Sequence, residues 1–140
     1  MNTTGSTSFY SMFSGCYYLT TIPQLDTSSG TSFGSMFSSC ESLTSIPQLN
    51  TSNGTNFSYM FSSCILFTTI PPLDTSKGTN FSNMFSGCSK LKRIEGISFK
   101  SLNKTVSGTY LTGYSTLNKL RYALIKDIGT CTGMTKIDFS

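Results

Sequence analysis

Four cysteines recur at a constant interval and are the residues of this sequence best suited to chemistry. They lie 24 residues apart, at Cys16, Cys40, Cys64 and Cys88. Thiolates bind zinc, form disulfides or act as nucleophiles. A zinc site needs ligands that converge on one point, whereas these cysteines would step along the axis of a repeat structure. We therefore expect a row of buried, reduced thiols, with disulfide pairing as the second possibility and a metal site as the third.

Other catalytic groups are scarce. The sequence has no histidine, which is the commonest general base, and only six carboxylates in 140 residues. Asp26 and Asp74 have a structural task in the turns expected below, and the equivalent residue between them is Asn50. Cys131 lies outside the 24-residue interval, and the odd number of cysteines is unlike a disulfide framework. We expect no enzymatic activity, no cofactor and no metal.

The elements that would position the thiols repeat at the same interval. Apolar residues occupy constant positions in each 24-residue block, and the most prominent row is Phe13, Phe37, Phe61 and Phe85. A fixed period of this length without insertions indicates stacked units, none of which can bury its apolar face alone. The sequence therefore predicts a solenoid whose core contains the cysteine and phenylalanine rows.

Each block divides into two halves with different periodicity. In residues 55–64 the apolar residues recur at i, i+3, i+4 and i+7, which predicts one face of a short helix. Thr55 is expected to cap this helix, and Gly54 to permit the chain reversal before it. The pattern Leu-x-x-Ile-Pro-x-Leu in the other half suits a short extended segment, which proline keeps brief because it lacks a backbone donor.

The predicted fold is an α/β solenoid of the leucine-rich-repeat type, with short parallel strands on one face and short helices or turns on the other. Asp26, Asn50 or Asp74, each followed by Thr-Ser, would close the turn between the halves. Residues 1–97 hold four regular 24-residue repeats. Residues 98–140 are expected to be divergent C-terminal repeats of the same solenoid, since a separate domain of that length would be short for its own core.

Charge is distributed unevenly along the chain. Residues 1–76 carry three acidic groups and no basic ones, whereas residues 77–140 carry ten basic groups against three acidic ones. The basic residues belong to no recognised nucleic-acid motif, so a solvated surface is favoured over nucleic-acid binding. No stretch approaches the roughly 18 to 20 consecutive apolar residues of a membrane span. The start lacks a secretory signal and lies within a repeat, which favours a segment of a longer protein.

The string Phe-x-x-Met-Phe-Ser-x-Cys-x-x-Leu-x-x-Ile-Pro resembles the leucine-rich repeats of the BspA-like family of bacterial and phage surface proteins. The matching segments are residues 12–16 with Leu19, 36–40 with Leu43, 60–64, and 84–88 with Leu91. The resemblance covers residues 2–97, although the 24-residue period and the proline depart from the family pattern. It implies a curved right-handed solenoid, an extracellular, cell-surface or virion location, adhesion to host or receptor molecules, and no catalytic residues.

The expected ligand face lies beside the strand motif. Its candidate residues are Thr21, Gln24, Ser45, Gln48, Thr69 and Arg93. Tyrosines outside the core rows could add contact area or could simply shield neighbouring backbone. They are Tyr10, Tyr17, Tyr18, Tyr59, Tyr110 and Tyr114.

These observations together predict a non-enzymatic leucine-rich-repeat binding module. We expect it to belong to a bacterial surface adhesin or to a phage receptor-binding or tail-fibre protein, and to recognise a protein or glycan on a cell surface. The alternative is a structural or assembly element, such as a virion decoration, a spacer or a self-associating solenoid.

Overall fold

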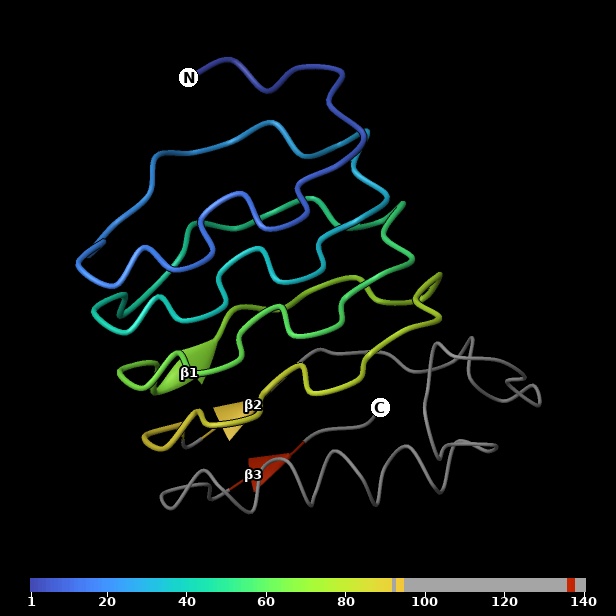
Figure 1. The fold of residues 1–140 in the computed structure, drawn as a ribbon. Helices are drawn as coiled ribbons and strands as arrows, with labels where there is room; N and C mark the ends of the chain where they lie inside the picture. The colour runs from blue at the N-terminus through green and yellow to red at the C-terminus, as the bar shows by residue number, and fades with distance from the viewer. Residues whose placement is uncertain (92, 95–135, 138–140) are drawn as a thin grey trace.

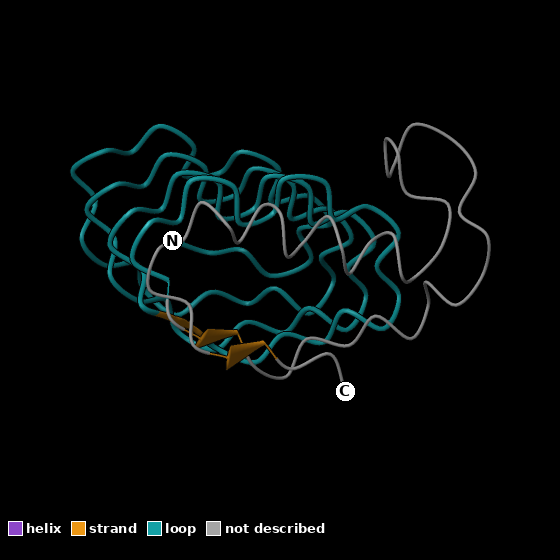
Figure 2. Ribbon diagram, turned by 90° about the horizontal axis from the view of Figure 1, so that it is seen from below, coloured by secondary structure: helices purple, strands orange, loops and turns teal. Residues whose placement is uncertain are grey.

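The chain winds into coils that stack along one axis (Figure 1). The structure, a computed structural model, describes residues 1–91, 93–94 and 136–137. Isolated parallel bridges join positions 24 residues apart, from Ser8 to Ser32, from Ser32 to Asn56 and from Asn56 to Asn80. Viewed along the stack, successive coils follow a similar outline (Figure 2). The predicted solenoid of 24-residue repeats is confirmed, whereas the boundary predicted at residues 97 and 98 lies outside the described residues.

Each coil has two halves, which we call the turn half and the extended half. The turn halves are residues 7–16, 31–40, 55–64 and 79–88, and the extended halves are residues 19–25, 43–49 and 67–73. Coils 1 to 4 are numbered from the turn half with which each begins.

The strands are very short. β1 (Thr69–Ile70), β2 (Arg93–Ile94) and β3 (Lys136–Ile137) pair in parallel in the order β1-β2-β3. They lie at one edge of the coils (orange in Figure 2). Pro71 follows β1 and has no amide hydrogen with which to extend the ladder. The prediction of brief parallel strands in the extended halves is confirmed from β1 onward, whereas the extended halves of coils 1 and 2 contain none.

The extended half buries every third residue. In coil 2 the side chains of Leu43, Ile46 and Leu49 are buried, and in coil 3 those of Phe67, Ile70 and Leu73 are. A period of three matches the three residues per turn of polyproline II, whereas a β-strand buries alternate residues. Proline favours this geometry because its ring fixes φ near about −65°. Two outward positions therefore separate successive inward ones, which gives the extended half a broad solvent-facing surface.

The short helix predicted for the turn half is absent from all the described coils. Every second amide from Phe57 to Ser63 donates to a carbonyl of coil 4, at 2.7–2.9 Å. The alternate amides from Met60 to Cys64 donate to the carbonyl three residues earlier, at 3.0–3.2 Å. An α-helix would direct its amides to the residue four positions earlier. Of the short helices or turns predicted for this face, the helix was therefore wrong and the turns are present. The predicted inward face is correct, since Phe57, Met60 and Cys64 are all buried.

Left-handed residues at two positions of the turn half produce this alternation. In coil 2 they are Ser35 and Ser39, with φ of 54° and 59°, and in coil 3 they are Tyr59 and Ser63, with φ of 55° and 58°. A left-handed residue reverses the sense of the local turn, so successive turns form a zigzag instead of accumulating into a helix. The zigzag leaves half of its amides free to bond to the next coil.

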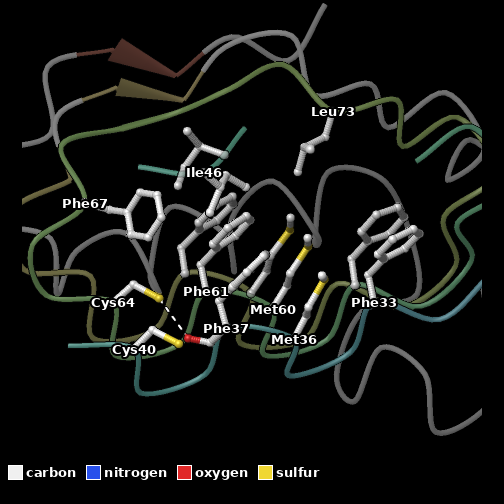
Figure 3. Packing of buried hydrophobic residues seen from close by; sticks show 14 of the residues in the cluster. Phe33, Met36, Phe37, Cys40, Ile46, Met60, Phe61, Cys64, Phe67 and Leu73 are labelled. Atoms are coloured by element: carbon white, nitrogen blue, oxygen red, sulfur yellow. Dashed lines mark hydrogen bonds between the residues drawn. The ribbon is translucent and has the colours of Figure 1, made fainter. Parts of the chain in front are cut away.

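The core consists of rows of like residues that run along the axis. Phe33 stacks on Phe57 and Phe37 stacks on Phe61, each pair with ring centroids 5.7 Å apart. The side chains of Met36 and Met60 lie one above the other in a parallel row (Figure 3). Since the period is constant, each coil places the same side chain over its neighbour. The predicted core residues Phe37, Phe61 and Phe85 are buried, whereas Phe13 of coil 1 is half-buried.

The glycine before each turn half has a packing role. A Cβ on Gly54 would lie 2.4 Å from Cζ of Phe57, and one on Gly78 would lie 2.2 Å from Cζ of Phe81. The phenylalanine ring thus rests directly on the glycine Cα. Neither glycine has a positive φ, so the chain reversal expected of Gly54 is not what requires glycine there.

Replacing Gly54 by alanine is therefore expected to destabilise the solenoid by about 1–3 kcal/mol, because the Phe57 ring must move within a packed core. The control is Gly15→Ser. Gly15 has φ of 74° with no atom near its missing Cβ, and serine occupies the equivalent positions 39 and 63. Gly15→Ser should lower the free energy of unfolding by less than about 1 kcal/mol. Urea denaturation measures both, and equal unfolding midpoints would contradict the packing role.

Candidate binding surface

The cysteine row lies inside the solenoid, and its thiols link neighbouring coils. Cys40, Cys64 and Cys88 are buried and form no disulfide. Each donates its S–H to a carbonyl oxygen of the preceding coil, as drawn for Cys64 in Figure 3. The pairs are Cys40 with Phe13, Cys64 with Phe37 and Cys88 with Phe61, at S···O distances of 2.9–3.1 Å. The prediction of a buried thiol row is confirmed for these three residues.

The environment of these thiols disfavours chemistry. Burial raises the pKa of the Cys40 thiol to about 11, and burial also raises the pKa of the Cys64 thiol. Since the thiolate is the reactive and metal-binding form, both thiols act as structural donors. No group of three or more potential metal ligands occurs within the described residues. Cys16 is exposed, so the prediction was wrong there, because coil 1 has a neighbouring coil on only one side.

The turns between halves are closed by hydrogen bonds that acidic and amide side chains form equally well. Oδ1 of Asp26 accepts from the Ser28 hydroxyl at 2.6 Å and from its amide at 3.1 Å. These two bonds hold the pKa of Asp26 below its ordinary value, and the bond from the Ser28 hydroxyl has the larger effect. Asn50 accepts the same two bonds from Ser52, at 2.8 and 3.2 Å. Closing the turn therefore requires an acceptor oxygen but no charge. The structural task predicted for Asp26 in this turn is confirmed.

Two of the predicted ligand-face residues also hold coils together. The Gln24 side-chain amide donates to the Gln48 carbonyl at 2.9 Å, and the Gln48 amide donates to the Pro72 carbonyl at 2.6 Å. A second polar row does the same, since the hydroxyls of Thr27 and Thr51 donate to the next coil at 2.8 and 2.9 Å. These side chains belong to the cross-coil hydrogen bonding, which sequence reasoning missed because each acceptor lies 23 or 24 residues away.

The remaining predicted ligand-face residues form an exposed row. Thr21, Ser45 and Thr69 occupy equivalent positions of coils 1, 2 and 3, and all three are exposed. Arg93 pairs with Thr69 in the β1–β2 ladder and so continues the row by strand register, although the structure describes only its backbone.

A second row of hydroxyls runs beside the first. It consists of Thr20, Thr44 and Thr68, which are likewise exposed. None of the six side-chain hydroxyls in the two rows forms a hydrogen bond within the described residues. The pair recurs every 24 residues, once on each coil. The structure therefore brings together an uncharged, periodic surface of free hydroxyls across coils 1 to 3.

The turn halves carry two exposed tyrosines, Tyr10 and Tyr59. The sequence analysis named both among six tyrosines that could add contact area or shield neighbouring backbone, and did not distinguish them from the other four. Alignment of the repeats could have singled out Tyr59, because the equivalent residues of the other coils are the small polar residues Ser11, Ser35 and Asn83.

The comparison with known families covers most of the chain. The family model described as "Mycoplasma protein of unknown function, DUF285" matches residues 1–111. The chain belongs to the DUF285 family. The match extends over the described parts of all four coils, so the 24-residue repeat lies within the DUF285 region. No curated protein and no solved structure matches the chain.

The bridging role of the glutamines predicts a difference between two exposed positions of coil 2. Gln48→Ala should lower the free energy of unfolding by about 0.5–1.5 kcal/mol, because it removes a cross-coil hydrogen bond. Thr44→Ala removes only an unbonded hydroxyl and should change it by less than about 0.5 kcal/mol. Urea denaturation of both variants is the measurement. Indistinguishable stabilities would show that the Gln48 bridge contributes nothing to the fold.

Proposed function

We propose that this DUF285 chain is a non-enzymatic binding module whose ligand lies across the extended halves of coils 1 to 3. The observation that supports it is the double row of exposed hydroxyls around Thr21, Ser45 and Thr69, none of which bonds within the described residues. Neighbouring polar rows, including Gln24 and Gln48, are already used to join coils. The hydroxyl rows are free to bond to another molecule.

The arrangement suits recognition by many small contacts. Each coil adds the same pair of groups at a fixed spacing, so a ligand gains hydrogen bonds in proportion to the number of coils it spans. Solenoids present extended surfaces of this kind without any single unit being decisive. The ligand class proposed for this face is a protein or glycan on a cell surface.

The proposed setting follows from the repeat pattern. The Met-Phe-Ser-x-Cys-x-x-Leu string resembles BspA-like leucine-rich repeats, and the chain shares with them a repeat solenoid. We therefore assign the module to an extracellular surface, as part of a bacterial adhesin or of a phage receptor-binding or tail-fibre protein. In the residues that the structure describes there is no helix capable of crossing a membrane.

The test is binding of the labelled chain to two kinds of cell, cultured animal cells for the adhesin and bacterial cells for the phage protein. The variant Thr21→Lys/Ser45→Lys/Thr69→Lys places a charged chain on each coil of the hydroxyl face and should lower binding at least about tenfold. The control Ser14→Lys/Ser29→Lys/Ile65→Lys adds the same charge at exposed positions elsewhere and should retain it. Equal binding by the two variants, or no binding by the wild-type chain, would overturn the proposal.

A second candidate function is self-association through coil 1. Its core-row side chains Met12, Phe13, Leu19 and Ile22 are only partly buried, whereas their counterparts in coil 2 are buried. Packing of this apolar surface against another copy would cover it. Sedimentation equilibrium distinguishes the candidates, since a monomer that still binds cells supports the binding module and a dimer that does not bind them supports assembly.

A further inference from the structure

The turn half of coil 3 holds an aromatic residue where the backbone disfavours one. Tyr59 has φ of 55°, and the equivalent left-handed residues are Ser11, Ser35 and Asn83. Short polar residues tolerate this conformation better than a bulky one does. The Tyr59 side chain is 45% exposed, so burial in the core does not compensate for the strain. Strain kept at an exposed aromatic residue points to a contact outside the chain.

A second exposed tyrosine lies on the same half of the solenoid. The Tyr10 ring of coil 1 lies against Gly34 of coil 2, where an added Cβ would be 3.0 Å from Cδ2 and 3.1 Å from Cε2 of the ring. Glycine thus lets the ring approach the backbone, whereas Ser58 and Ser82 occupy the equivalent positions of the next coils. Since 58% of Tyr10 remains exposed, much of the ring is available to a ligand.

An oriented amide lies beside the Tyr10 ring. The Cβ that was placed on Gly34 above would also lie 2.7 Å from Nδ2 of Asn56. The Asn56 amide and the Tyr10 ring therefore both lie close to the Gly34 Cα. Oδ1 of Asn56 accepts from the Ser58 amide at 3.0 Å and from its hydroxyl at 2.8 Å, which fixes the side chain. Within the described coils Nδ2 makes no hydrogen bond. Asn56 and Tyr59 belong to the same turn half, three residues apart.

The chemistry of this surface is neutral. The four turn halves contain no charged residue, so an ionic ligand would find no counter-charge among them. Exposed aromatic rings stack on the C–H faces of sugar rings, and amide and hydroxyl groups bond to sugar hydroxyls. We propose that Tyr10, Asn56 and Tyr59 form a binding site for a neutral sugar unit of a glycan. The site is separate from the hydroxyl rows of the extended halves and does not depend on the function proposed for them.

The repeat itself supplies the test variant. Tyr59→Ser places at this position the residue that coils 1 and 2 carry with the same φ, so the fold should tolerate it. Removing a bulky side chain from a left-handed position should leave the melting temperature unchanged or raise it by about 2–6 °C. The probe is a panel of immobilised neutral oligosaccharides containing glucose, galactose, mannose or N-acetylglucosamine, presented to the full chain. Binding should fall at least about tenfold in Tyr59→Ser.

Two controls and the extended-face variant complete the design. Tyr59→Phe keeps the ring and should retain most binding, and Tyr18→Ser removes a 92% exposed tyrosine outside the turn halves and should retain all of it. Loss of oligosaccharide binding in the variant Thr21→Lys/Ser45→Lys/Thr69→Lys, with binding by Tyr59→Ser unchanged, would assign the sugar to the hydroxyl face instead of to this site. The proposal is overturned if the wild-type chain binds no neutral sugar, or if Tyr59→Ser binds normally or melts at a lower temperature.

Discussion

Hydrogen bonds between the backbones of neighbouring coils are the interaction on which the rest of this structure depends. In the turn halves of coils 1 to 3 every second amide donates to the following coil, as Phe33 does to Asn56 and Phe57 does to Asn80, both at 2.8 Å. These bonds fix equivalent residues above one another. A constant 24-residue period then stacks phenylalanine on phenylalanine and methionine on methionine, so a core forms without helices and almost without β-strands in the described coils.

The same alignment divides the polar residues into two groups. Some reach the next coil or close a turn, as Gln48, Thr51 and Asp26 do. Others, among them the hydroxyls of Thr21 and Thr69, bond to nothing in the described coils and face solvent in regular rows. Stability therefore depends on the first group, and the second is the group that we propose for recognition. The separation allows exposed residues to vary without disturbing the stack, because each outward row lies outside the core.

The sequence revealed the solenoid because the repeat is free of insertions, and it placed Phe37, Phe61 and Cys64 in the core correctly. It could not distinguish a helix from a zigzag of turns, since both bury residues at i, i+3, i+4 and i+7. The difference depends on left-handed serines such as Ser35, a conformation that composition does not reveal. Contacts over one whole coil, such as that of Gln24 with Gln48, were equally hidden. The packing of the Phe57 ring on Gly54 spans only three residues, and it was missed because the expected chain reversal had already explained that glycine.

The buried thiol row offers the most direct measurement of coil stacking. The folded chain is treated with iodoacetamide at pH 8, and peptide mass spectrometry then reports which cysteines carry the adduct. Stacked coils predict that exposed Cys16 reacts while Cys40, Cys64 and Cys88 stay unmodified until denaturant is added, because burial blocks access and raises the pKa of Cys40 to about 11. Modification of Cys64 as fast as Cys16, with the circular dichroism spectrum unchanged, would contradict the account.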